Sequence, residues 1–276
     1  MYETGLIRIS PSASKFRKED LEALNIVFRP ASSEDAVIPA INVKDYPKKY
    51  EIPEINSLIR GDPNFNVNNF KKIQDNRVKT FIDKLHDVIR MDVAKGTDES
   101  TTDTLVSDML SHAADMDSWP FIFRRHPFCE LVIGGKAVSA RPEFVIDKGR
   151  IAIVVIEDKH LKNKMLTKGT GFGEVQLAAE ILACGSVNLR DVYMGEYVDQ
   201  EIFAIRVISS YFTFYRTVIT ASYWEELDLS LPKEQMVMIE RWPPKNGKDE
   251  GLDIAELGGR KAVLMALAKI REHLLQ

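Results

Sequence analysis

Residues 150 to 160 read RIAIVVIEDKH, and this stretch limits the possible folds more than any other part of the chain. Ile151 to Ile156 form an uninterrupted apolar run, which has the length and the β-branched composition of a strand buried on both faces. The polar residues Glu157 to His160 follow at once, and such groups are costly to bury without partners. We therefore predict a buried strand that ends in polar side chains, and we expect other groups near that end to balance their charge.

The first part of the chain has the pattern of helices. Residues 1–68 are rich in proline, asparagine and mixed charge, which predicts an extended arm with one or two short helices, one of them near residues 18–27. Apolar residues at helical spacing predict a long amphipathic helix over 69–93 and a second helix built on Leu105 and Leu110.

From Cys129 the period of the apolar residues changes to that of strands. Three apolar segments separated by glycine turns predict an antiparallel three-strand meander, over residues 129–133, 137–146 and 150–158. Further predicted elements are a helix that ends at Gly185, strands over 201–210 and 211–220, and a terminal helix over 260–275.

The predicted fold class is therefore α/β. We expect a mixed central sheet of four or five strands that contains the antiparallel meander and is flanked by helices, plus a mainly helical N-terminal region. The shift from helical to strand patterns divides the chain into an N-terminal arm and helical region, residues 1–96, and a second domain, residues 97–276.

The turn DKGR determines the register of the predicted hairpin. If its loop has three residues, with Gly149 in the left-handed conformation, Asp147 pairs with Ile151. Glu143 on the first strand is then a diagonal neighbour of Glu157 on the second, and both carboxylates lie on one face of the sheet. A hairpin closed one position differently would put these carboxylates on opposite faces.

Lys159 shares the face of Glu157 because side chains alternate along a strand, whereas Asp158 and His160 point to the other face. Two carboxylates this close repel and raise each other's pKa unless a cation lies between them. Oxygen ligands without histidine or cysteine suit Mg²⁺ or Mn²⁺, which also bind phosphate oxygens of substrates. A lysine beside such a metal can orient the attacking water or neutralise a phosphate. Glu143, Glu157 and Lys159 together therefore predict metal-assisted hydrolysis of phosphodiester bonds.

Pro142-Glu143, followed by Glu157-Asp158-Lys159, resembles the bipartite signature of the PD-(D/E)XK, or restriction-endonuclease-like, nuclease superfamily. In that superfamily an acid on one core strand and an acid-x-lysine on the next hold the metal and the water. The resemblance covers about residues 97–220 and is closest to fungal nuclease-like proteins of unsettled role. The motifs similar to that group are DEST at 98–101, EDK at 157–159, QLAAE at 176–180 and FTFY at 212–215.

The resemblance also implies roles for further residues. Glu99 would be a helix acid that approaches the metal, so that Glu99, Glu143 and Glu157 hold one or two Mg²⁺ or Mn²⁺ ions. Gln176 would brace the site or touch the scissile phosphate, and Glu180 shares its helix face one turn later. The sequence departs from the pattern at Glu143, where aspartate is usual, and the extra methylene moves the carboxylate by more than an ångström.

We therefore predict a nuclease that requires Mg²⁺ or Mn²⁺ and acts on DNA or RNA, with Glu143, Glu157, Lys159 and Gln176 as its catalytic residues. The alternative is a nuclease-like fold with little or no activity, which binds nucleic acid or a protein partner. A third reading, by analogy of fold, is an effector or selfish-element nuclease directed at foreign or host DNA.

Composition narrows the partners and the compartment. The net charge of -4 argues against coating nucleic acid by bulk charge, although a local basic groove remains open. Cys129 and Cys184 match no zinc spacing and imply no disulfide framework, which favours a reducing compartment. The first residues lack the apolar region of a secretory signal, and no apolar run is long enough for a membrane helix. We expect an intracellular protein, in the cytoplasm or nucleus, with no membrane partner.

Overall fold

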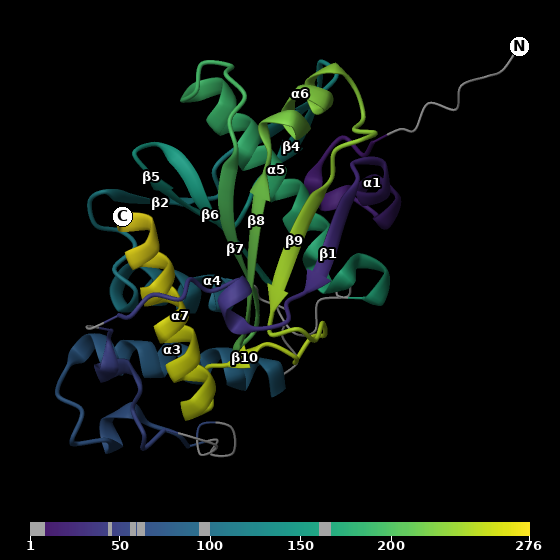
Figure 1. Cartoon of the computed structure of the whole chain (residues 1–276). Coiled ribbons are helices and arrows are strands. Elements are labelled where there is room, and N and C mark those ends of the chain that lie inside the picture. The colour runs from purple at the N-terminus through teal and green to yellow at the C-terminus, as the bar shows by residue number, and fades with distance from the viewer. Residues whose placement is uncertain (1–8, 44–45, 56–58, 60–63, 94–99, 160–166) are drawn as a thin grey trace, which may run out of the picture.

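The computed structural model describes residues 9–43, 46–55, 59, 64–93, 100–159 and 167–276. Over these residues the chain is built on an eight-stranded mixed sheet with helices on both faces (Figure 1). The strands are β1 (Ile26–Pro30), β2 (Phe121–Arg125), β3 (Cys129–Ile133), β4 (Lys136–Ala140), β5 (Phe144–Lys148), β6 (Ile151–Lys159), β7 (Gln200–Ile208), β8 (Tyr211–Ile219), β9 (Val237–Trp242) and β10 (Leu252–Asp253). The helices are α1 (Lys18–Ala23), α3 (Asn76–Val93), α4 (Ser100–Asp108), α5 (Glu174–Asp191), α6 (Ala221–Leu229) and α7 (Leu257–Leu275).

The main sheet has the order β1-β9-β8-β7-β6-β5-β2, with β10 paired to β8. The pairs β1–β9 and β6–β7 are parallel, and the remaining pairs in the sheet are antiparallel. The α/β class and the mixed sheet flanked by helices are confirmed. The sheet is larger than predicted because β1, β2, β9 and β10 were not expected from the sequence.

Two hydrophobic cores cover the two faces of the sheet. Val154 and Ile156 of β6 lie in the core that also contains side chains of α3, α4 and α7. Val155, between them, lies in the other core, with side chains of α5 and α6. The predicted buried strand is therefore confirmed, and its alternating residues face different helices.

The predicted meander is not formed. Its first segment, β3, pairs only with β4, in a separate two-stranded sheet. Its second segment is divided between β4 and β5, because Pro142 lies between them and proline cannot donate a ladder hydrogen bond. Strand β5 instead lies between β2 and β6. The Glu157-bearing strand β6 therefore lies between β5, which is antiparallel to it, and β7, which is parallel to it.

The β5–β6 hairpin differs from the prediction at two places, which together shift the pairing by two residues and so leave the faces of the side chains unchanged. Lys148 pairs with Ile151, so the loop has two residues, and Gly149 and Arg150 both have positive φ. The prediction that Asp147 pairs with Ile151 was wrong. A register shift then follows, because Ile146 pairs with Val154 while Asp147 pairs with Ala152. This bulge in β6 inserts one residue and returns the start of β5 to the face it would have had with the longer loop.

Two helix predictions need correction. The helix that was expected to end at Gly185 continues to Asp191. Gly185 is required there for packing, because a Cβ atom would lie 2.6 Å from Cζ2 of Trp224. The long N-terminal helix begins at Asn76 rather than at residue 69. The terminal helix and the strands β7 and β8 are confirmed.

The N-terminal residues are part of the same sheet and core. Helix α1 lies within the predicted 18–27 segment, and the chain then forms β1, which pairs with β9. Side chains from residues 31–89 fill one core together with α7. The proposed boundary at residue 96 lies outside the described residues and stays a prediction. Among the helices that the structure describes, none is both long and apolar enough to cross a membrane.

Candidate active site

The carboxylates of Glu143 and Glu157 meet at the ammonium group of Lys159. Lys159 Nζ lies 2.5 Å from Glu157 Oε1 and 3.9 Å from Glu143 Oε1. The side chain of Glu157 is fully buried, while those of Lys159 and Glu143 are 12% and 19% exposed. The two-residue turn and the bulge produce this meeting, because they bring the start of β5 beside the end of β6 with matching faces.

Asp103 and His126 extend the group of side chains around Glu143. The Nδ1 atom of His126 lies 2.9 Å from Glu143 Oε2, and the backbone N–H of His126 donates to the carbonyl oxygen of Glu143 at 2.9 Å. Asp103 comes from α4, and its carboxylate joins the other two so that one ligand atom from each lies within 4.8 Å of the others. Three metal-binding groups therefore converge at the rim of the site.

Gln176 and Glu180 reach the site from α5. The two residues lie one turn apart, and Gln176 Nε2 donates to Glu180 Oε1 at 2.9 Å. Glu180 is fully buried, and among the described residues no donor reaches its Oε2 atom. The predicted shared helix face is confirmed by this hydrogen bond. Glu180 thus brings a second fully buried carboxyl next to Glu157.

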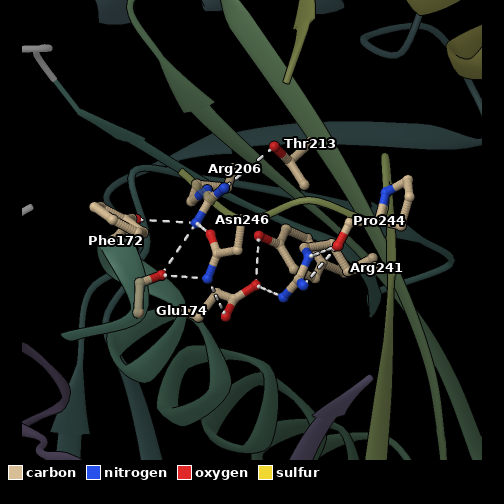
Figure 2. A network of polar contacts seen from close by, with 9 residues as sticks. Phe172, Glu174, Arg206, Thr213, Arg241, Pro244 and Asn246 are labelled. Atoms are coloured by element: carbon tan, nitrogen blue, oxygen red, sulfur yellow. Dashed lines mark hydrogen bonds and ion pairs between the residues drawn. The ribbon is translucent and has the colours of Figure 1, made fainter. Parts of the chain in front are cut away.

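A buried polar network holds the start of α5 against the sheet (Figure 2). Glu174, the first residue of α5, accepts hydrogen bonds from Arg241 at 2.7 Å, from Asn246 at 2.8 Å and from Tyr215 at 3.1 Å. Arg206 donates to the carbonyl oxygens of residues 171 and 172, just before the helix, and to Asn246. Because β7, β8 and β9 all contribute to the network, the position of α5 is fixed relative to the sheet.

The same network places a buried cation beside the candidate site. Arg206 pairs with Glu157 in the parallel β6–β7 ladder, so the two side chains leave neighbouring strands on the same face. Arg206 is fully buried, and its hydrogen bonds go to carbonyl, amide and hydroxyl oxygens, the last from Thr213 (Figure 2). The end of β6 is therefore flanked by a lysine in its own strand and an arginine in the next.

Burial dominates the electrostatics of the carboxyls. The pKa of Glu157 rises to about 7, mainly because burial penalises the charged form; Lys159 opposes the rise and Glu143 adds to it. Burial also raises the pKa of Glu180 well above its ordinary value, and the charge of Glu157 raises it further. Glu157 is thus a buried carboxyl whose pKa lies near neutral pH.

Asp158 lies on the opposite face of β6, as predicted from the alternation. It is fully buried, and no donor among the described residues reaches either of its oxygens. Its pKa is raised well above the ordinary value, first by burial and then by the nearby carboxyl of Asp103. Asp103 is therefore shared between the two faces, next to Asp158 on one and next to the Glu143–His126 pair on the other.

The structure gathers the predicted site residues Glu143, Glu157, Lys159 and Gln176 at one end of β6. Glu99 lies outside the described residues, and so does His160. Asp103 and His126 were missed as candidates. A signal for Asp103 was present, since it follows Glu99 by four residues and such residues share a helix face. His126 had none, because its position depends on the pairing of β2 with β5, which the sequence did not indicate.

The chain was compared with known proteins. No protein-family model matches it, and a search of curated proteins returned no match.

Proposed function

We propose that the chain is a metal-dependent nuclease that hydrolyses phosphodiester bonds of DNA or RNA. The observation that carries the proposal is the set of buried carboxyls around Lys159 at the end of β6. Burial, and after it the charge of Glu143, raises the pKa of Glu157 to about 7. Proteins retain such costly arrangements mainly at functional sites. A divalent cation would offset the repulsion between the carboxylates, and its binding would explain why they lie together.

The donor set fits a divalent cation. Asp103, His126 and Glu143 present one ligand atom each within 4.8 Å, and Lys159 holds Glu157 beside Glu143. Carboxylate oxygens suit Mg²⁺ and Mn²⁺, whereas an imidazole is unusual for Mg²⁺. We therefore favour Mn²⁺, with Glu143 and Glu157 as the carboxylate ligands and Asp103 and His126 at its rim. Such an ion supplies a Lewis acid that stabilises the charge of the reacting phosphate.

The protein's own groups would perform the remaining steps. Lys159 is partly exposed and its ammonium lies within 4 Å of both carboxylates, so it can hold the attacking water by a hydrogen bond and balance charge on the phosphate. Gln176 donates its amide to Glu180, whose carboxyl lies close to Glu157 and Lys159. Lys159 would position the water and Gln176 would orient the nucleic-acid substrate, and together they would favour attack on one phosphate.

The arrangement of the strands supports a restriction-endonuclease-like core. The acids lie on an antiparallel hairpin, β5–β6, and the second strand of that hairpin is parallel to β7. Helix α5, which follows β6 in the sequence, packs on the face that carries Glu157. This order of elements agrees with the similarity of the Pro142-Glu143 and Glu157-Asp158-Lys159 motifs to that superfamily, and we propose the assignment on both grounds.

One observation favours a second function, a nuclease-like module that binds nucleic acid or protein without cutting it. Lys159 and His126 already contact the two carboxylates, so the charges of this part of the site can be balanced without a metal. Buried ion pairs of this kind also occur as purely structural features.

A cleavage assay separates these functions. Labelled single-stranded and duplex DNA and RNA are incubated with wild type, with Glu157→Gln and with Lys159→Met, in Mn²⁺. An exposed glutamate on α6 supplies the control variant Glu225→Gln. We expect wild type and control to cut. The two site variants should lose about two orders of magnitude or more in cleavage rate, which is the effect of removing a general acid–base group. Equal, low cleavage by all four proteins would contradict a nuclease, and retained nucleic-acid binding would then support the module.

A further inference from the structure

A cavity of about 220 Å³ lies directly beside the candidate active site. Gln176 and Glu180 of α5 line it on one side, and the chain from Ser139 to Arg141 lines it on another. Arg141 precedes Glu143 by two residues, which span at most about 7 Å, so the cavity lies close to the carboxylate cluster. The volume is below the roughly 300–1,000 Å³ of sites for drug-sized ligands. It offers room for one flat ring rather than for a base pair.

An exposed aromatic ring and a cation stand at the cavity. Phe128 also lines it and is 57% exposed, so its ring is accessible from solvent. The guanidinium of Arg141 lies 5.9 Å from the centroid of the Phe128 ring. Aromatic faces stack on nucleobases, and arginine binds phosphate or stacks beside them, so this pair has the chemistry of a single-strand binding platform.

The remaining walls consist of serine and alanine residues and are held in place. Ser12, Ser14 and Ser139 line the cavity, and their hydroxyls can donate to or accept from the edge of a base. The serine-bearing N-terminal segment is tied to β4, because the backbone N–H of Ser139 donates to the carbonyl oxygen of Pro11 at 3.1 Å. Buried Asp20 holds the neighbouring residue Ser10 by accepting from its backbone N–H and hydroxyl, at 3.0 and 2.8 Å. The cavity is thus formed before any ligand arrives.

We infer that this cavity takes one unpaired nucleobase of the strand whose phosphate lies at Lys159, so that the substrates are single-stranded nucleic acids or single-stranded ends. The inference rests on the proposed function. Phe128 would stack on the base, Arg141 would contact the adjoining phosphate, and the serines would meet the edge of the base. A base inside a duplex has both faces stacked and its edge paired, so it enters such a cavity only after it leaves the helix, at an energetic cost.

The inference is tested by binding rather than by cleavage. Fluorescence anisotropy gives the dissociation constants of a labelled single-stranded oligonucleotide and of its blunt duplex, in Ca²⁺ so that oxygen ligands are occupied by a hard cation. The proteins are wild type, Phe128→Ala, Phe128→Leu and Phe128→Trp. Because Phe128 is largely exposed, these variants are expected to keep the wild-type melting temperature.

We expect wild type to bind the single strand more tightly than the duplex. Loss of the stacking ring in Phe128→Ala should weaken single-strand binding by about 5- to 150-fold. Phe128→Leu should be equally weak, since it keeps apolar bulk without a π face, and Phe128→Trp should bind like wild type. Equal affinity for single strand and duplex, no binding of either, or unchanged binding by Phe128→Ala would each overturn the inference.

The two proposals fail separately. If binding of the single strand depends on Phe128 but the wild type cuts nothing in Mn²⁺, base binding in the cavity is supported and the nuclease proposal is refuted. If the wild type cuts duplex and single strand at equal rates and Phe128→Ala cuts as fast, the nuclease proposal is supported and base binding in the cavity is refuted.

Discussion

Replacement of Glu157 by glutamine should change how the stability of the protein depends on pH. Glu157 is fully buried and its pKa rises from 4.5 to about 7 in the folded state, first because of burial. A carboxyl whose pKa is higher in the folded than in the unfolded chain stabilises the fold below its unfolded pKa. That contribution is lost as the pH rises through the folded pKa. The window for Glu157 therefore runs from about pH 4.5 to about pH 7.

The size of the effect follows from the shift. One pKa unit corresponds to about 1.4 kcal/mol, so ionisation of Glu157 should remove roughly 3 kcal/mol of stability between pH 5 and pH 8. The amide of Glu157→Gln has a similar shape but does not ionise. The variant should therefore lose less stability over this range than the wild type, by up to about that amount.

Urea unfolding at about pH 5 and about pH 8, without divalent ions, measures this difference. A repeat with Mn²⁺ at the higher pH should restore stability to the wild type, because the metal binds the ionised carboxylates, by about 2.7 kcal/mol at a concentration 100 times the Kd. Glu157→Gln should gain little. If the two proteins show the same loss between the two pH values, Glu157 does not titrate as its burial requires, and the reasoning is refuted.

Three other changes test separate parts of the structure. His126→Ala should lower the ratio of Mn²⁺- to Mg²⁺-supported cleavage by about tenfold or more, since the imidazole favours Mn²⁺; an unchanged ratio would exclude His126 from the metal environment. Arg241→Met should reduce the free energy of unfolding by about 3–5 kcal/mol, because it leaves Glu174 buried without its ion-pair partner at 2.7 Å. Adding Glu174→Gln to that variant should recover much of the loss, and no recovery would mean that the ion pair is not the cause. Gly185→Ala should destabilise the fold by about 1–3 kcal/mol, because a Cβ atom would lie 2.6 Å from Trp224 and the clash outweighs the better helix propensity; a raised melting temperature would contradict this packing.

The candidate site could be predicted from the sequence where it depends on a single strand. The apolar run before Glu157 requires a buried strand, and the period of two in a strand places Lys159 on the face of Glu157. Glu143 joined them through a combination that the sequence did not reveal. The loop is one residue shorter than expected and a bulge in β6 adds one residue, so the pairing shifts by two residues in all and Glu143 stays on the face of Glu157. Turn length has a glycine signal, whereas this bulge has no recognisable residue pattern.

Long-range pairing accounts for what the sequence did not show. His126 reaches Glu143 because β2 lies beside β5, and β1 joins the sheet through β9, more than 200 residues later in the chain. Such contacts depend on which edge of the sheet is available, and local propensity does not encode it. Gly185 illustrates the opposite error. A glycine near the end of a helical pattern usually marks a C-terminus, but here it gives space to Trp224 within the helix.

The most direct test of the proposed metal site is anomalous X-ray scattering from crystals grown with Mn²⁺. We predict an anomalous peak within about 2.5 Å of carboxylate oxygens of both Glu143 and Glu157, and no such peak in crystals of Glu157→Gln. A peak that lies only at Asp103 and Asp158, or the absence of any peak near Glu143 at saturating Mn²⁺, would contradict the account.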